Sequence, residues 1–279
     1  MIKAPARIWL CADDYGISPS VDAAIRDLLA RGRINATSAI VVAPSFQRSE
    51  AVSLNTLNTE AHRVAIGLHV TLTAPFWPLS AGFAPKYAST FLPLAATFKH
   101  AFLYRFEHQQ LLAEVTAQLD AFISAFGRAP DFVDGHQHVQ LLPQVRDAVL
   151  ATVKAKAPQA WVRQCGRALP LHRRFSDRKG LLLDLLSAKF RARAAASGVR
   201  TNPAFAGTYD FSASADFAEL FPKFLDRLPE NGVVMCHPGF VDAELKRLDP
   251  LTTLREKEYA YFAGEDFLNL LAAHSIALA

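Results

Sequence analysis

The sequence is poor in the features that mark several large classes of protein. Its 279 residues include three cysteines, which lie far apart and show no Cys-x-x-Cys spacing. No apolar run is long enough to cross a membrane, and the N-terminal residues do not resemble a signal peptide. We therefore predict a reduced, cytoplasmic protein without a transmembrane segment. Cys11 and Cys236 end apolar runs and are expected to be buried free thiols.

Dense positive charge and two common catalytic motifs are also missing. The net charge is +4 with no block of lysine and arginine, so a nucleic-acid partner is not expected. There is no Gly-x-Ser-x-Gly motif and no glycine-rich phosphate loop, which disfavours serine-hydrolase and nucleotide chemistry. The most basic stretch, 171–196, is expected to be helical. Its charge favours a solvated helix face, with an anionic ligand or peripheral contact with a lipid surface as the alternative.

Hydrophobic residues make up 51% of the chain, enough for a full core in a single domain spanning 1–279. Short apolar runs predict strands at 6–10, 37–42, 64–70, 132–134, 161–163, 232–237 and 276–279. Helical periodicity predicts helices at 19–31, 45–54, 108–126, 143–155, 180–196, 215–228 and 264–274. This alternation predicts an α/β protein with parallel strands joined by helical crossovers.

The segment 73–105 interrupts the alternation. It contains several prolines and many aromatic residues, so we expect a long irregular insertion. Loops of this length in a compact domain are usually functional. The aromatic side chains suit stacking on a sugar ring or an apolar ligand, and they equally suit packing on the rim of the fold.

Asp13 and Asp14 follow the first apolar run, where we expect a strand to end and a loop to begin. Ligands of α/β proteins bind at that end of the strands. Two neighbouring carboxylates repel each other unless a cation or a shared proton offsets the repulsion. The pair therefore predicts a nearby positive charge. A solvated turn, with Gly16 supplying a positive φ, is the simpler alternative.

Histidines occur at the same point of later strand–loop units. His69 ends the third expected strand, and Asp134 to His138 (DGHQH) follow the fourth. Histidines two apart on an extended segment point the same way, so His136, His138 or both can face a pocket, with Asp134 fixing an imidazole tautomer. One carboxylate and two imidazoles commonly hold a catalytic divalent metal; we expect Zn²⁺ or Mg²⁺, with Mn²⁺, Co²⁺ and Ni²⁺ as alternatives. Each histidine can instead be a core residue or a helix cap.

His237 and Arg163 end two further expected strands. An imidazole titrates near neutral pH, so His237 suits a general acid, although a third metal ligand or a core histidine fits as well. Arg163 can orient a carboxylate, contact a substrate oxygen or form an ordinary salt bridge. Together these residues favour metal-assisted hydrolysis, in which a free carboxylate removes a proton from water and a histidine protonates a leaving nitrogen.

Four motifs carry a family resemblance: ADDYG (12–16), GLH (67–69), DGHQHV (134–139) and MCHPGF (235–240). In this order they resemble the YdjC-like carbohydrate deacetylases, the ChbG/HpnK group, which are distantly related to NodB-type polysaccharide deacetylases. The resemblance implies a single-domain, distorted TIM-like (β/α) barrel with mostly parallel strands, often a homodimer. It also implies removal of an acetyl group from an N-acetylated sugar.

The resemblance also implies roles for individual residues. By position, Asp14, His69 and His136 correspond to metal ligands, with His138 as a supporting residue or an alternative ligand. Asp13 corresponds to the general base, with Arg163 beside it, and His237 corresponds to the general acid.

The chain departs from the family pattern at Gln140, where many relatives have histidine, and at Tyr15, where they usually have phenylalanine. The insertion and the basic stretch match no family pattern, so an oligosaccharide and a lipid-linked glycan both stay open as substrates. Two alternatives remain: hydrolysis of another amide or ester on the same metal site, and an inactive relative that binds a sugar or a lipid.

Overall fold

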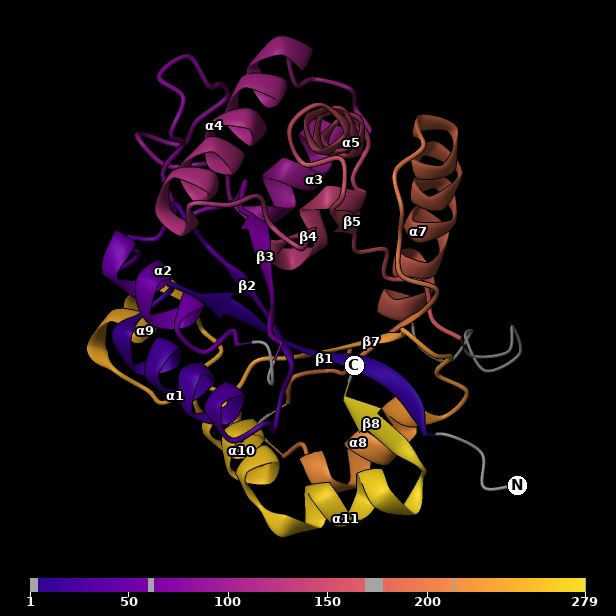
Figure 1. Cartoon of the computed structure of the whole chain (residues 1–279). Helices are drawn as coiled ribbons and strands as arrows, with labels where there is room; N and C mark the ends of the chain where they lie inside the picture. The colour runs from indigo at the N-terminus through magenta and orange to yellow at the C-terminus, as the bar shows by residue number, and fades with distance from the viewer. Residues whose placement is uncertain (1–4, 60–62, 169–177, 213, 279) are drawn as a thin grey trace.

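The computed structural model describes residues 5–59, 63–168, 178–212 and 214–278. Its strands are β1 (Ala6–Tyr15), β2 (Ala36–Ala39), β3 (Ala65–Val70), β4 (Phe132–Gly135), β5 (Trp161–Val162), β6 (Phe205–Ala206), β7 (Val233–Cys236) and β8 (Ile276–Leu278). They form one parallel sheet in the order β5-β4-β3-β2-β1-β7-β6, with β8 paired to β1. The sheet curves, and helices pack around its outside (Figure 1).

Backbone hydrogen bonds connect the two ends of this curved sheet. The amide of Val162 on β5 donates to the carbonyl of Arg200 at 2.9 Å, and the amide of Phe205 on β6 donates to Gly166 at 3.0 Å. The predicted fold class, an α/β single-domain, distorted TIM-like barrel with parallel strands, is therefore confirmed. In such a fold the carboxyl ends of the strands open on one face, where β1, β3, β4 and β7 bring their last residues together.

The helices are α1 (Pro19–Ala30), α2 (Arg48–Asn55), α3 (Leu94–Phe102), α4 (His108–Phe126), η1 (His136–Leu141), α5 (Val145–Lys156), α7 (Arg178–Ser197), α8 (Phe217–Leu225), α9 (Ala243–Leu248), α10 (Thr253–Ala263) and α11 (Glu265–Ala273). Local signals explain several of their ends. The Ser18 hydroxyl caps α1, and Pro19 occupies its first position. Gly127, at φ 70°, ends α4 in the left-handed conformation.

The insertion 73–105 is not irregular throughout, because α3 (Leu94–Phe102) lies within it. Pro93 stands at its N-cap, where the missing amide hydrogen costs nothing. Phe98 and Phe102, one turn apart, stack with ring centroids 6.1 Å apart. The cluster of prolines before Leu94 obscured this short helical pattern in the sequence.

The strand β6 and the helices α9 and α10 were also not expected. β6 has two residues, too few to show an alternating pattern. On α10 the buried face contains the charged residues Arg255 and Glu258, so it lacks the apolar stripe by which a helix is recognised. The expected helix 180–196 is confirmed as α7, whereas residues 171–177 of the basic stretch lie outside the described residues.

The cysteine and membrane expectations agree with the structure. Cys11 and Cys236 are buried and free, as predicted, and Cys165 is as well. Among the described residues no helix combines the length and the apolar character that a membrane span needs.

Asp22 ties helix α1 to the turn that follows β1. It is almost fully buried, and its Oδ1 accepts a hydrogen bond from the amide of Gly16 at 2.5 Å. Burial outweighs this hydrogen bond, and with the charge of Glu50 it raises the pKa of Asp22 from 3.8 to about 8. The folded protein therefore keeps a proton on Asp22 at pH values where the unfolded chain has lost it.

We expect the Asp22 proton to make folding pH-dependent. Between about pH 4 and pH 8 the folded state binds more protons at this site than the unfolded state, so its contribution to the free energy of unfolding falls as pH rises. Asp22→Asn cannot lose this proton, so its stability relative to the native protein should increase by up to about 1.4 kcal/mol per pH unit in that window. Urea unfolding across the window measures the difference. Parallel pH profiles for the two proteins would contradict the assignment.

Candidate functional site

Asp13 and Asp14 lie inside β1, at a bulge. The strand was expected to end at Leu10 but continues to Tyr15, and its pairing with β2 shifts register between Ala12 and Tyr15. Asp14 has φ 71°, a left-handed conformation that is uncommon outside glycine. Successive strand residues normally face opposite sides, so the bulge is what allows both carboxylates to serve one site. Both are almost fully buried, which excludes the solvated turn.

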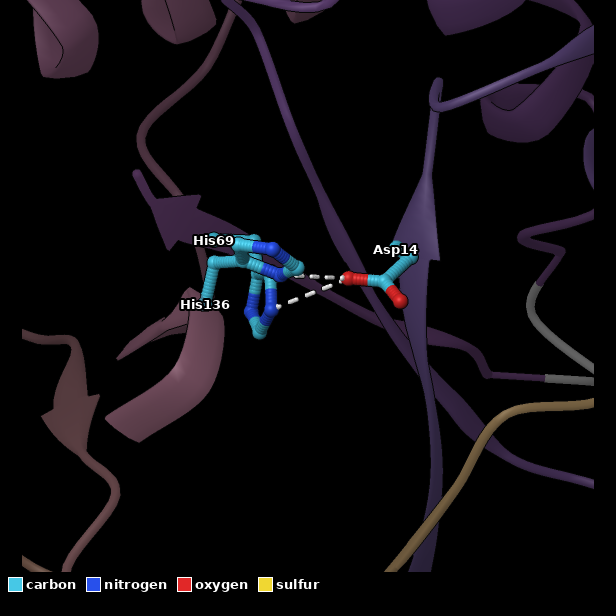
Figure 2. Close-up of side chains that lie close together, drawn as sticks. All are labelled: Asp14, His69 and His136. Atoms are coloured by element: carbon cyan, nitrogen blue, oxygen red, sulfur yellow. Dashed lines mark hydrogen bonds and ion pairs between the residues drawn. The ribbon is translucent and has the colours of Figure 1, made fainter. Parts of the chain in front are cut away.

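Asp14 on β1, His69 on β3 and His136, the first residue of η1 directly after β4, come together (Figure 2). The Oδ1 atom of Asp14 is 3.3 Å from Nε2 of His69 and 3.0 Å from Nδ1 of His136. One ligand atom from each residue lies within 4.8 Å of the other two, and all three residues are buried. The structure thus brings together the three residues that the family resemblance implies as metal ligands.

The orientation of His69 is set by its neighbours on the adjacent strands. Asp134 is its register partner on β4, and Oδ1 of Asp134 lies 2.6 Å from Nδ1 of His69. The Ser38 hydroxyl, from β2, lies 3.0 Å from the same nitrogen. A carboxylate at Nδ1 keeps a hydrogen there and turns Nε2 toward Asp14. Asp134 does fix a tautomer, as predicted, but that of His69.

Asp13 forms a second, separate pair with Arg163. Nη1 and Nη2 of Arg163 donate to the two carboxylate oxygens of Asp13, both at 2.7 Å. Nη2 is also 2.9 Å from Sγ of Cys11 and 2.6 Å from Oδ2 of Asp134. Cys11, Asp13 and Asp134 could geometrically hold a metal, but the guanidinium of Arg163 already provides the positive charge there. The placement of Arg163 beside Asp13 agrees with the expectation from the sequence.

Charge decides the protonation of these buried groups. Burial opposes ionisation of Asp13, but Arg163 and His69 outweigh it and lower the pKa of Asp13 to about 2. Arg255 and His136 likewise hold the pKa of Asp14 well below its ordinary value despite burial. Burial disfavours a charged His69, yet Asp134 and Asp13 raise its pKa to about 10. The surroundings of the two buried carboxylates therefore favour a positive charge.

A divalent metal fits the Asp14, His69 and His136 group. One carboxylate oxygen and two imidazole nitrogens converge there, and this donor set suits Zn²⁺, Co²⁺, Ni²⁺ and Mn²⁺ better than Mg²⁺, which prefers oxygen. Asp134 supports His69 from behind, as carboxylates commonly support metal-bound histidines. The ring of Phe76 meets His136 edge-on, with centroids 5.7 Å apart, so the insertion 73–105 borders the group.

His138 does not lie beside His136 as an extended segment would place it. Residues His136–Leu141 form a 3₁₀ turn, in which Gln137 and His138 have φ of 55° and 61°. Nδ1 of His138 instead lies 3.5 Å from Sγ of Cys165. Burial, with the charge of Arg163, lowers the pKa of His138 to about 3, so it stays neutral. The segment is therefore not extended as expected, and of the readings that the sequence left open the structure places His136, and not His138, in the three-residue group.

His237 follows β7 and is partly exposed. Its charge contributes to lowering the pKa of Asp13, so the two side chains share one electrostatic environment. The ring of Phe211 meets the His237 ring edge-on, with centroids 5.7 Å apart. The backbone amide of His237 donates to Oε2 of Glu258 at 2.5 Å. His237 is not part of the three-residue group, which argues against its alternative reading as a third metal ligand.

Three residues at the site were missed in the sequence. Ser38 contacts His69, Arg255 donates to Asp14, and Glu258 holds the amide of His237. Arg255 and Glu258 share a face of α10, three residues apart, and this spacing of opposite charges is common on solvated helices. Nothing in the local pattern distinguishes a buried pair from an exposed one.

Gln140 and Tyr15, the two residues that depart from the family pattern, both form hydrogen bonds through their side chains. The side-chain amide of Gln140 donates to the carbonyl of Arg163 at 3.2 Å, so it supports the residue that pairs with Asp13. The hydroxyl of Tyr15 donates to the carbonyl of Glu50 at 3.0 Å and accepts from Arg26 at 2.8 Å.

A model of the family described as YdjC-like protein matches residues 7–273. The chain belongs to the YdjC-like family. The resemblance carried by the four motifs is therefore confirmed. A chitooligosaccharide deacetylase of Serratia marcescens is 28% identical over 239 residues, covering 84% of this chain and 82% of the relative. One from Klebsiella pneumoniae (strain 342) is 27% identical over 235 residues, covering 83% and 81%.

A solved structure supports the fold of this YdjC-like chain. It is a protein of Enterococcus faecalis V583 for which a role in cellobiose-phosphate cleavage has been suggested. The two structures agree with a TM-score of 0.74 at 23% sequence identity, covering 99% of this chain and 97% of the other. At this identity the likeness concerns the fold.

If the Asp14, His69 and His136 group binds a divalent metal, loss of either imidazole should weaken that binding. We expect His69→Ala and His136→Ala each to weaken Zn²⁺ binding by more than about 100-fold, beyond the 10- to 100-fold cost typical of supporting residues. Titration with a chromophoric zinc chelator measures the dissociation constant. His274→Ala, at an exposed histidine on the C-terminal side of α11, is the matched control and should leave binding unchanged. Full zinc occupancy in a folded His69→Ala protein would exclude this site.

Proposed function

We propose that this YdjC-like protein is a metal-dependent hydrolase that removes the acetyl group from an N-acetylated sugar. The observation that carries the proposal is the buried Asp14, His69 and His136 group, with a separate arginine-paired carboxylate, Asp13, next to it in the same strand. The chitooligosaccharide deacetylases among its relatives support the same reaction class. The proposed roles of the individual residues combine this geometry with the positions of these residues in the family motifs.

The metal held by Asp14, His69 and His136 would supply Lewis acidity, which polarises the amide carbonyl and acidifies water. Asp13 is ionised, so its carboxylate can accept the proton of the attacking water. Arg163 holds both oxygens of Asp13 and fixes their direction. His237 gives a proton to the amide nitrogen as the carbon–nitrogen bond breaks. Water and the N-acetyl group thereby yield acetate and a free amine.

The insertion 73–105 offers a surface for the sugar. Phe76 is buried against His136, which brings this segment to the edge of the metal group. The next residue, Trp77, is 44% exposed, and its Nε1 donates to the hydroxyl of Ser89 at 3.2 Å. An exposed, tethered indole suits stacking on a sugar ring. Whether that sugar is a free oligosaccharide or a lipid-linked glycan stays open, and the homodimer and the cytoplasmic location stay predictions.

Asp13→Asn should separate metal binding from catalysis. An amide cannot accept the proton from water, so we expect kcat to fall by about 10²–10⁴, the usual worth of a general base. Zinc affinity should stay close to that of the native protein, because Asp13 is not among the three ligands. Asp22→Asn, a buried aspartate outside the site, is the matched control. A folded Asp13→Asn protein that no longer binds zinc would refute this division of roles.

The reaction class is tested by measuring acetate released from a panel of substrates. We expect the zinc-loaded protein to release acetate from N-acetylglucosamine oligomers or from lipid-linked N-acetylated glycans, and not from simple aryl acetates. His69→Ala gives the background rate. Turnover of esters alone would favour the alternative hydrolase, and no turnover of any substrate by zinc-loaded protein would favour an inactive binding relative.

A further inference from the structure

Helix α10 brings two buried charges to the site. Arg255 is fully buried and Glu258 is 1% exposed. They lie three residues apart, on one face of the helix. Burying a charge is costly unless it is paired and hydrogen-bonded, so the partners of these side chains show what their burial achieves.

Arg255 holds the oxygen of Asp14 that does not face the imidazoles. Its Nη2 donates to Oδ2 of Asp14 at 2.6 Å and to Oδ2 of Asp249 at 2.7 Å. Its Nε donates to the carbonyl of Leu251 at 2.9 Å, which anchors the guanidinium. Oδ1 of Asp14 is the atom that faces His69 and His136. Arg255 therefore occupies one carboxylate oxygen and leaves the other for the metal group.

Glu258 holds the backbone at His237. Its Oε2 accepts from the amide of His237 at 2.5 Å, and its Oε1 accepts from the hydroxyl of Tyr209 at 2.7 Å. The carbonyl of Arg255 accepts from the amide of Gly239 at 3.1 Å, two residues further along the same loop. A Cβ on Gly239 would lie 3.0 Å from a methyl group of Val21 on α1 and 3.4 Å from Cδ of Arg255 on α10. The loop therefore passes close to both helices.

We propose that α10 is the positioning helix of this site. Arg255 orients Asp14 as a ligand that offers a single oxygen, and Glu258 places the loop that carries His237. Neither side chain is assigned contact with the substrate or the metal, so both act through another residue. The inference rests on the proposed function, but the role of Arg255 is tested by zinc affinity alone, without any measurement of activity.

The Arg255 arm is tested by zinc affinity. Arg255→Met should weaken zinc binding by about 10- to 100-fold, the usual cost of losing a residue that supports a ligand. Arg255→Lys keeps the charge but loses the planar guanidinium, whose Nη2 and Nε contact Asp14 and the Leu251 carbonyl at the same time, so it should recover part of the loss. It also serves as the test if the methionine variant does not fold. Arg33→Met is the matched control, because Arg33 is a buried arginine that pairs with Glu265 away from the site. It should bind zinc as the native protein does.

The Glu258 arm is tested by separating kcat from affinity. Glu258→Ala frees the His237 loop and should lower kcat by about 10- to 100-fold, as small displacements of reacting groups do. KM and zinc affinity should stay within about twofold of native, and Glu258→Gln, which keeps an acceptor oxygen, should restore most of the turnover. A merely structural role would lower kcat and zinc affinity together and would not be rescued by glutamine.

The outcomes distinguish the two proposals. Native protein that binds no zinc overturns the proposed function and this inference with it. If the native protein binds zinc and a folded Arg255→Met or Arg255→Lys protein binds it equally well or more tightly, the positioning role of Arg255 is wrong. The proposed function is then unaffected. Zinc binding without deacetylation by the native protein overturns the proposed function and the Glu258 arm, while the affinity series still decides the role of Arg255.

Discussion

Two neighbouring carboxylates buried in one strand are the constraint on which this structure depends. Asp13 and Asp14 are both almost inaccessible to solvent, and each has its own buried arginine, Arg163 and Arg255. These arginines come from positions 150 and 241 residues away along the chain. Without them the pair would carry a large desolvation and repulsion cost. Burial of the C-terminal end of β1 therefore depends on contacts that the folded sheet and α10 provide.

The bulge in β1 gives the two carboxylates separate partners. A regular strand would send Asp13 and Asp14 to opposite faces. The left-handed backbone at Asp14 and the shifted register allow one carboxylate to face two imidazoles and the other to face a guanidinium. Non-glycine residues in this conformation persist where the surrounding structure holds them. Here the surrounding contacts are the arginine pairs themselves.

Much of this arrangement could be predicted from the sequence, and particular residues show why. Asp14, His69 and His136 each follow or end an apolar run, and parallel strands bring such residues to one face whatever the details of the loops. His138 was misplaced because its position depends on a turn with two left-handed residues, and Gln137 and His138 give no signal for that turn. Arg255 and Glu258 were missed because only the fold shows that they are buried and which groups they contact; Asp14, for example, lies 241 residues from Arg255.

The last point bears on how YdjC-like sites are recognised. The four motifs contain Asp14, His69 and His136, the residues of the candidate metal group. Arg255 and Glu258, which hold Asp14 and the His237 loop in place, lie outside every motif. Asp14 alone can present either oxygen or both, and a flexible loop at His237 can hold its ring at many distances from Asp13. Arg255 and Glu258 remove these freedoms through hydrogen bonds of 2.6 and 2.5 Å. A chain that kept the motifs but lost the charges of α10 would therefore keep the ligands and lose their preorganisation, which is where much of an enzyme's rate enhancement originates.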